Sequence, residues 1–340
     1  MSLPTASAAP ARPHSPGSPV PGVAVALAVA AVSLLSSRLL PGVSALIIAI
    51  ILGIVMANLS TLPAALSPGL SFAAKKLLRA GIVLLGLQVV LGDLLALGAP
   101  MLAVVTAVVA GGILGTLAIG RALGVDRDLT ILVACGFSIC GAAAVAAAAG
   151  VTDPEDEHEE RTVTAIALVV LCGTVMIVAV PAVAALLDLA PRTAGLWAGA
   201  SIHEVAQVVA AGGALGGAAL TIAVIVKLAR VLMLAPVMAV LSLQQRRTGA
   251  ADGKRPPLVP LFVLGFLAMV ALRSVVPLPA GVLEAGSLLQ TVLLAAAMFA
   301  LGTGVKVRHL LRVGPRPLAL AALSTLLVAT LALAGVLLTA

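Results

Sequence analysis

The feature that most constrains this chain is a series of uncharged apolar runs that recurs from one end to the other. Val43–Leu59 and Met101–Ile119, for example, contain no Asp, Glu, Lys or Arg. A helix of about 20 such residues spans the ~30 Å hydrocarbon core of a bilayer. Only 10% of the 340 residues are charged, which is too few to cover a soluble domain of this length. We therefore predict an all-α polytopic membrane protein.

The apolar runs predict about eleven transmembrane helices in one transporter domain, residues 20–340. Residues 1–19 are rich in Pro, Ala and Ser, a composition typical of a disordered tail. The predicted spans are Val20–Leu35, Val43–Leu59, Leu77–Leu97, Met101–Ile119, Leu129–Val151, Thr162–Leu187, Ala194–Ala211, Ala218–Leu241, Leu258–Val276, Leu283–Val305 and Pro317–Leu338.

The basic residues predict the orientation of these spans. Fifteen of the 20 Lys and Arg residues fall on the side of the N-terminus, and two lie inside a span. The three on the opposite side are Arg38, Arg161 and Arg273. Cytoplasmic loops are enriched in Lys and Arg, so the N-terminus is expected in the cytoplasm and the C-terminus outside. The net charge of +7 thus reflects topology, and no nucleic-acid partner is expected.

Two of the predicted spans look interrupted. The fifth contains CGFSICGAAAVAAAAG (Cys135–Gly150), and the tenth contains AAAMFALGTGV (Ala295–Val305). Broken helices at matching positions in two halves point to a transporter site. An offset of five spans predicts one leading helix plus two inverted five-helix repeats, residues 43–187 and 194–338, each with a broken fourth helix. The alternative is that Gly and Ala only allow close helix packing.

Two cations lie deep inside the eighth predicted span, at Lys227 and Arg230. Each is expected to cost about 2.5–3.5 kcal/mol at the bilayer centre. They must therefore face protein, water or an anion, and their i, i+3 spacing places both on one face of a helix.

A second cluster of polar residues, His203, Glu204 and Gln207, interrupts the apolar stretch GLWAGASIHEVAQVVAAGG (Gly195–Gly213). His203 and Gln207 are four residues apart and would share a helix face, with Glu204 about 100° away. Glu204 could neutralise Lys227 or Arg230, and His203 is either a packed polar residue or a proton carrier. Two cations and one carboxylate leave an excess positive charge that an anionic substrate would balance.

The sequence lacks the motifs of an enzyme or a pump. HEVAQ has Gln207 where the zinc-protease helix HExxH has its second histidine, and there is no nucleotide-binding motif. We expect no enzyme activity, no metal and no cofactor, so any transport must be secondary. Cys135, Cys140 and Cys172 are expected to be packing residues, and Trp197 to lie at a membrane interface. The acidic loop Thr152–Arg161 would be a solvated turn outside, or a place where cations are captured.

Five stretches of the sequence resemble the YeiH-like sulfate exporter family of bacterial membrane proteins, and they follow one another in the order found in that family. The resemblance implies distant kinship with the inverted-repeat fold of cation/proton antiporters and bile-acid-type symporters, in which two broken helices cross at the midplane. The family's SICG motif corresponds to Ser138–Gly141 and its IHEVAQ motif to Ile202–Gln207, but Ala142 and Ala143 stand where it often has Ser or Thr. Its intramembrane basic pair corresponds to Lys227 and Arg230. The stretches are Leu77–Gln88, Cys135–Val145, Gly195–Gly212, Val226–Val237 and Ala297–Gly304.

Residues and resemblance together predict a secondary active transporter of a small anion, a sulfate-like oxyanion or a sulfonate, working by proton-coupled export in the bacterial inner membrane. Its partners would be membrane lipid, a coupling proton or Na⁺ and, by analogy, a second copy in a homodimer. Two alternatives stay open: a Na⁺/H⁺-type cation antiporter with Glu204 as the cation site, and a non-transporting membrane protein. The expected substrate-binding residues are Gly136, Ser138, Cys140, Gly141, Lys227, Arg230, Gly302, Thr303 and Gly304, and the expected coupling residues are His203, Glu204 and Gln207.

Overall fold

The computed structural model describes residues 18–40, 44–153, 158–248, 261–304 and 314–339. Within these ranges every regular element is a helix, which confirms the predicted all-α class. Six helical stretches among the described residues are long and apolar enough to cross a bilayer, and one of them, Gly217–Arg247, joins two consecutive helices; the chain is therefore a multi-pass membrane protein. The prediction of a disordered tail at residues 1–19 falls almost entirely outside the described residues.

The first half of the described chain contains α1 (Val20–Leu39), α2 (Ala45–Leu59), η1 (Ala64–Leu66), α3 (Ser67–Phe72), the π-helical turn η2 (Ala73–Leu77), α4 (Leu78–Leu85), η3 (Gly86–Gln88), α5 (Leu91–Ala96), α6 (Gly98–Leu123), α7 (Arg127–Ser138) and α8 (Ala142–Thr152). The second half contains α9 (Glu159–Leu186), α10 (Pro191–Ser201), α11 (Val205–Leu215), α12 (Gly217–Leu232), α13 (Leu234–Thr248), α14 (Leu261–Val275), α15 (Ala280–Gly304) and α17 (Pro315–Thr339).

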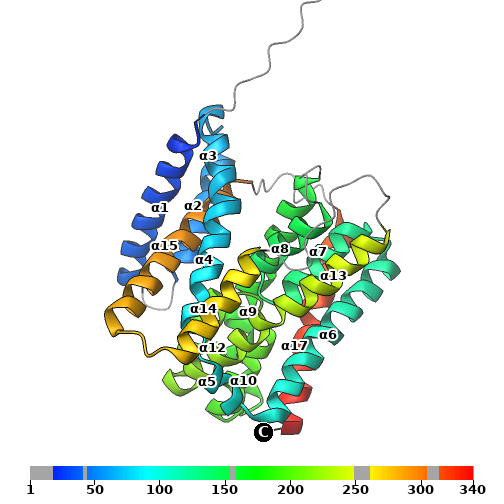
Figure 1. Ribbon diagram of the computed structural model, residues 1–340. Coiled ribbons are helices and arrows are strands. Elements are labelled where there is room, and N and C mark those ends of the chain that lie inside the picture. The colour runs from blue at the N-terminus through cyan, green and yellow to red at the C-terminus, as the bar shows by residue number, and fades with distance from the viewer. Residues whose placement is uncertain (1–17, 41–43, 154–157, 249–260, 305–313, 340) are drawn as a thin grey trace, which may run out of the picture.

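The helices form two groups that pack mainly within themselves (Figure 1). The first group contains α1 to α4, α14 and α15, and the second contains α6 to α13 and α17. Small residues bring the helices of a group close together. A Cβ atom at Gly53 of α2 would lie 2.3 Å from the carbonyl oxygen of Phe299 on α15, so only glycine fits there.

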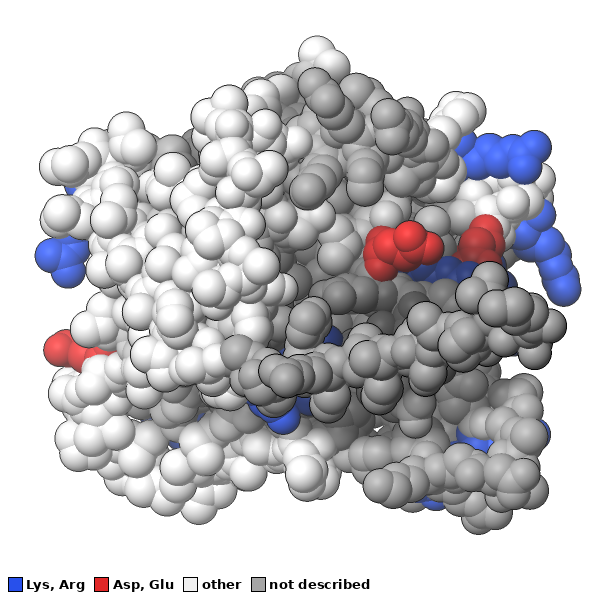
Figure 2. Space-filling view, turned by 90° about the horizontal axis from the view of Figure 1, so that it is seen from above, with Lys and Arg blue, Asp and Glu red and all other residues white. Residues whose placement is uncertain are grey.

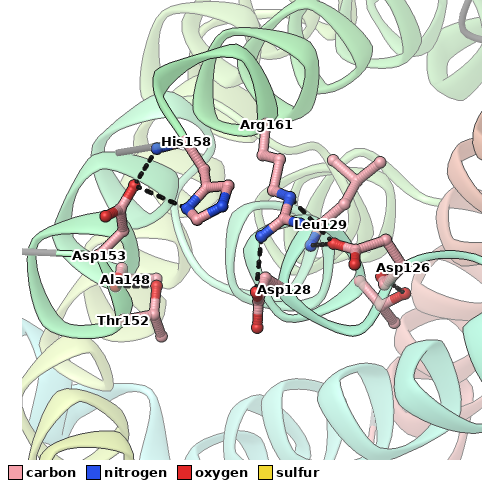
Figure 3. Close-up of polar contacts among 9 residues, drawn as sticks. Asp126, Asp128, Leu129, Ala148, Thr152, Asp153, His158 and Arg161 are labelled. Carbon is pink, nitrogen blue, oxygen red and sulfur yellow. Dashed lines mark hydrogen bonds and ion pairs between the residues drawn. The ribbon is translucent and has the colours of Figure 1, made fainter. Parts of the chain in front are cut away.

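Helices α7 and α8 form a re-entrant pair, which we call hairpin A. The guanidinium of Arg161, near the start of α9, lies 3.3 Å from Asp126 and 2.7 Å from Asp128, at the start of α7 (Figure 3). Asp153, just after α8, accepts a hydrogen bond from the backbone N–H of His158, which precedes α9. Hairpin A therefore begins and ends at the same end of the molecule, with its tip inside the bundle.

Helices α10 and α11 form a second re-entrant pair, hairpin B, which enters from the opposite end. Gly195 near the start of α10 packs against Ala219 and Ile222, and Gly212 near the end of α11 packs against Leu220. Both limbs thus begin or end beside the first turns of α12. The predicted spans Leu129–Val151 and Ala194–Ala211 are hairpins, and the count of eleven spans is not confirmed.

Because two of the predicted spans are hairpins, two basic residues lie at the end of the molecule opposite to the one predicted for them. Arg161 lies at the end where α7 begins, and Arg192 lies at the opposite end, where α10 begins. The two residues exchange sides relative to the predicted topology, so the charge totals stay the same. Figure 2 views the molecule from the end where α7 begins, and basic side chains stand around its rim. Arg121, Arg127, Arg246, Arg247 and Arg316 belong to helix termini at this end.

The predicted layout of two five-helix repeats is also not confirmed by the structure. The tenth predicted span is not broken, because α15 continues from Ala280 to Gly304. Gly302 packs on α2, where a Cβ would lie 2.4 Å from the carbonyl oxygen of Ile50. Small residues at this position serve helix packing, which is the alternative that the sequence left open. The second interruption lies instead in hairpin B, at Ile202–Glu204.

Candidate functional site

The two hairpin tips meet inside the second helix group. In hairpin A, α7 ends at Ser138, and α8 begins at Ala142 after Gly141, whose φ of 76° is in the left-handed region. In hairpin B, α10 ends at Ser201 and α11 begins at Val205. Each tip therefore presents the carbonyl end of one short helix and the N–H end of another. We call this region the tip junction.

The two tips share a sequence pattern at an offset of 63 residues. Gly136, Ser138, Ile139, Val145 and Ala148 in hairpin A correspond to Gly199, Ser201, Ile202, Val208 and Ala211 in hairpin B. Because the hairpins enter from opposite ends, this is an inverted repeat of a hairpin, shorter than the five-helix unit that the sequence was expected to contain.

Lys227 on α12 binds the carbonyl ends of both hairpins. Its ammonium donates to the carbonyl oxygens of Ile139 in hairpin A at 2.9 Å and of Ile202 in hairpin B at 2.8 Å, and also to that of His203. The side chain is fully buried. Three charge-assisted hydrogen bonds replace the water that this ammonium loses on burial.

Arg230, one turn further along α12, makes the same kind of bridge. Its guanidinium donates to Phe137 at 2.9 Å and Ser138 at 3.1 Å in hairpin A. In hairpin B it donates to the carbonyls of Ala200 at 2.7 Å and Ile202 at 3.0 Å. As the i, i+3 spacing predicted, both cations lie on one face of α12. Both positive charges are stabilised by the negative, carbonyl ends of the α7 and α10 helix dipoles.

Glu204 lies at the opposite, N–H ends of the second limbs. Its Oε1 accepts a hydrogen bond of 3.0 Å from the backbone N–H of Ala142, the first residue of α8. A Cβ on Gly141 would lie 2.2 Å from Glu204 Cγ, so this glycine supplies both the left-handed φ and the space for the carboxylate. Glu204 forms no ion pair with Lys227 or Arg230, two residues that the structure fully describes, so the structural ion pair that the sequence left open is not present.

Gln207 holds Glu204 in place through a capping box. The Gln207 side-chain oxygen accepts the N–H of Glu204 at 3.2 Å, and the Glu204 carboxylate accepts the backbone N–H of Gln207. The amide nitrogen of Gln207 donates to Val170 of α9 at 3.3 Å. Gly173 leaves room for this amide, because a Cβ there would lie 2.0 Å from Gln207 Oε1. Gln207 is thus a positioning residue.

His203 belongs to the tip, before α11 begins, so the predicted helix face shared with Gln207 does not exist. Its Nδ1 lies 3.2 Å from the Phe137 carbonyl and its Nε2 lies 3.0 Å from the Thr325 hydroxyl on α17. That hydroxyl is also 2.9 Å from the carbonyl of Ala321. If Nε2 carries a proton, it donates to Thr325, and Thr325 donates to Ala321; if the ring is neutral with its proton on Nδ1, Thr325 donates to Nε2. The direction of the Thr325 hydroxyl therefore depends on the tautomer and the protonation of His203.

A cavity of about 580 Å³ lies between the two helix groups and reaches the tip junction. Cys140 and Ala143 of hairpin A and Glu204 and Val205 of hairpin B line its inner end. Gln88 and Gln290, which are hydrogen-bonded to each other, line its middle with Ser287 and Thr291. Arg38 and Glu284 line the part nearest the end where α1 finishes and α15 begins. Lys227 and Arg230 do not line the cavity.

The structure brings most of the predicted site residues together. Gly136, Ser138, Cys140 and Gly141 form or adjoin the tip of hairpin A, beside His203, Glu204, Lys227 and Arg230. The Ser138 hydroxyl is buried against Gly112 of α6, so of the three predicted substrate-binding residues in the SICG motif, Ser138, Cys140 and Gly141, only Cys140 lines the cavity. Gly302, Thr303 and Gly304 lie at the end of α15, away from the junction.

Three further expectations concern single side chains. Trp197 was expected at a membrane interface, but it is buried, and its indole nitrogen donates to Ala329 of α17 at 2.9 Å. The three cysteines are free thiols. Among the described residues, no group of three or more His, Cys, Asp or Glu side chains is arranged to hold a metal ion.

Sequence reasoning missed the residues that line the outer cavity. Arg38, Gln88, Glu284 and Gln290 are polar residues of three largely apolar segments, α1, η3 and α15, and their common position appears only once these segments are packed together. The repeated Gly-x-Ser-Ile pattern of the two tips was a signal in the sequence that could have identified the second interruption.

Comparison with known proteins assigns the chain to a family. The family described as conserved hypothetical protein 698 matches residues 21–321. A UPF0324 membrane protein of Corynebacterium glutamicum is 58% identical over 94% of this chain and 92% of the relative. The UPF0324 membrane protein TauZ of Paracoccus denitrificans is 37% identical over 93% of this chain and 94% of the relative. No solved structure matches the chain. The chain belongs to the UPF0324 family of membrane proteins, the YeiH-like group that its motifs resemble.

Proposed function

We propose that this protein is a secondary transporter of a small anion, a sulfate-like oxyanion or a sulfonate, and that the anion binds where the cavity meets the tip junction. The family resemblance to sulfate exporters supports this substrate class. The observation that carries the proposal is that two buried cations occupy the carbonyl ends of the hairpins, while the N–H ends point toward the cavity.

The charges at the junction support an anion. The carbonyl ends of α7 and α10 carry about −0.5 each, and the N–H ends of α8 and α11 carry about +0.5 each, so the four helix ends cancel. Lys227 and Arg230 supply two positive charges and Glu204 one negative charge. With His203 neutral, the junction has a surplus of one positive charge, which a bound anion would neutralise.

The hydrogen bonds argue against a Na⁺ site at the same place. A cation site in a broken helix takes its ligands from the unwound backbone carbonyls. Here the carbonyls of Phe137, Ser138 and Ile139 in hairpin A are bound by Arg230 and Lys227, as are those of Ala200 and Ile202 in hairpin B. The protein's own cations hold the positions that Na⁺ would need.

The arrangement of the helices supports alternating access. The cavity lies between two groups of helices that pack mainly within themselves, so one group can move against the other without breaking its own core. The positive-inside rule places the end where α7 begins in the cytoplasm of a bacterial cell, and the cavity then faces outward. We propose that the protein resides in the inner membrane, as a transporter and not an enzyme.

Flux measurements in liposomes test the proposal. Purified protein is reconstituted into vesicles loaded with labelled sulfate, sulfite or organic sulfonates, with and without a pH gradient. We expect efflux of at least one of these anions, and a weaker efflux after a thiol reagent has modified Cys140 at the inner end of the cavity. Protein-free vesicles and the Cys140→Ser variant treated with the same reagent are the controls.

Two other results would contradict the proposal. Exchange of Na⁺ for protons without flux of any anion would establish the cation antiporter, with the cavity-lining Glu204 as its site. Absence of both fluxes from a folded protein would favour a membrane protein that does not transport.

A further inference from the structure

We propose that a divalent anion binds the tip junction together with one proton, and that Glu204 carries this proton. The inference rests on the proposed function and specifies the charge of the substrate and its coupling. Its basis is the position of one carboxylate in a cluster of fixed charges at the inner end of the cavity.

Glu204 lies where the cavity meets the tip junction, beside the proposed anion site. Its carboxylate accepts N–H groups of both second limbs, from Ala142 in hairpin A and from Gln207 in hairpin B. It also lines the cavity, so protons from the aqueous side reach it by the same route as the anion. Among the described residues that line the inner end of the cavity, Glu204 is the one carboxylate, since Glu284 lies toward the other end.

The charged and titratable groups that face Glu204 from neighbouring elements determine whether a proton is taken up or released when the anion binds. Lys227 and Arg230 of α12 lie behind it, the Cys140 thiol of hairpin A lies beside it, and His203 precedes it in its own hairpin. Helix α9 offers it no charged side chain, only the backbone against which Gln207 packs. Both cations are held by carbonyls and stay where they are when Glu204 gains a proton.

Charge balance then links the proton to the anion. With Glu204 ionised, the junction has one surplus positive charge, which matches a monovalent anion. With Glu204 protonated, it has two, which match a divalent anion such as sulfate. Placing a divalent anion beside an ionised Glu204 in a low-dielectric site would leave one uncompensated negative charge, which is costly. Sulfate binding therefore takes up one proton, which adds to a carboxylate oxygen of Glu204.

Calorimetric titration of the detergent-purified protein with sulfate tests this linkage. Titrations in two buffers that differ in ionisation enthalpy give the number of protons taken up for each sulfate bound. We expect about one proton for the unmodified chain above the pH at which Glu204 ionises, and a Kd that rises about tenfold for each pH unit there. Methanesulfonate, which is monovalent, should bind with much less than one proton.

The Glu204→Gln variant removes the titratable group at this position but preserves the hydrogen bond between the hairpins, because a glutamine oxygen can still accept the Ala142 N–H. We expect this variant to bind sulfate with no proton uptake and with a Kd that does not change with pH. The matched control, Glu284→Gln, alters the other carboxylate of the same cavity and should keep the uptake. A thermal unfolding curve for each variant shows that it is folded.

Each remaining outcome overturns a particular statement. Sulfate binding without proton uptake by the unmodified chain, or equal uptake by Glu204→Gln, overturns the assignment to Glu204. Equal uptake with methanesulfonate overturns the matching of charge. If neither anion binds at any pH, the proposed function fails, and this inference fails with it.

Discussion

At the scale of single residues, Lys227 and Arg230 act through the backbone. Both are fully buried, and their donors go to carbonyl oxygens of the two hairpins. They hold the two tips in place, and they contribute positive charge to the junction without lining the cavity. A bound anion would feel these cations without touching them.

The variant Lys227→Met tests the structural part of this role. It leaves the carbonyls of Ile139 and His203 without this donor, while the Ile202 carbonyl keeps its hydrogen bond from Arg230. Each unsatisfied buried group costs about 1–3 kcal/mol. We expect a loss of at least about 2 kcal/mol in the free energy of unfolding, seen as a lower Tm in detergent, together with loss of anion flux. The control Arg192→Met changes a cation at the start of α10 and should leave the Tm nearly unchanged. Equal Tm values for the two variants would show that the carbonyls do not need Lys227.

The variant Gly141→Ala tests the contact between the hairpins. Its new Cβ would lie 2.2 Å from Glu204 Cγ, in addition to the strain of a left-handed φ. Gly216→Ala is a matched control, because Gly216 has a φ of 108° and no atom within 4 Å of its Cβ position. We expect Gly141→Ala to reduce flux more than tenfold, and Gly216→Ala to cost about 1–3 kcal/mol of stability with flux retained.

A double-mutant cycle assigns the effect of Gly141→Ala to its neighbour. If the clash with Glu204 is the cause, adding Gly141→Ala to a Glu204→Ala background should lower stability no more than Gly216→Ala does. An equal and additive effect in both backgrounds would mean that the alanine acts elsewhere.

Sequence reasoning identified the buried polar residues of the tip junction but not their contacts. Charged residues in an apolar span stand out by their cost, so Lys227, Arg230, Glu204 and His203 could be identified without a structure. The partners of the two cations could not, because backbone carbonyls are present at every residue and become available only where a helix ends. The ion pair with Glu204, which the sequence left open, does not form for this reason.

At the scale of elements, two re-entrant hairpins replace two predicted spans. A hairpin of two short apolar helices has nearly the same length and hydropathy as a single span, so composition does not distinguish them. The positive-inside rule did not distinguish hairpins from spans, because Arg161 and Arg192 exchange ends and the number of Lys and Arg residues at each end stays the same. The Gly-Thr-Gly run of α15 was mistaken for a break because small residues serve both interrupted and closely packed helices.

Labelling of introduced cysteines distinguishes a hairpin from a span. In a background in which the three native cysteines are alanine, single cysteines replace Arg127 at the start of α7 and Glu160 at the start of α9. If α7 and α8 are re-entrant, an impermeant maleimide labels both positions from the same side of oriented vesicles. A cysteine at Arg192 should be labelled from the other side. Labelling of positions 127 and 160 from opposite sides would restore the predicted span.

At the scale of the whole molecule, the proposed transport depends on two groups of helices with a cavity between them. The cavity connects the end that carries Arg38 and Glu284 to the tip junction, and its middle is lined by uncharged amides and hydroxyls. An anion that enters meets polar groups first and the surplus positive charge last. This gradient requires the whole assembly, since α1, α4 and α15 contribute the outer part and the hairpins the inner part.

The central claim is that the inner end of the cavity is positive, and Cys140 provides a native probe of it. In a Cys135→Ala, Cys172→Ala background, Cys140 is modified with two methanethiosulfonate reagents of similar size, one bearing a sulfonate and one a trimethylammonium group. Each rate is divided by the rate with a small free thiol. We predict that the sulfonate reagent reacts about tenfold faster than the cationic one, with the difference shrinking when sulfate is present. A faster reaction with the cationic reagent would contradict the account.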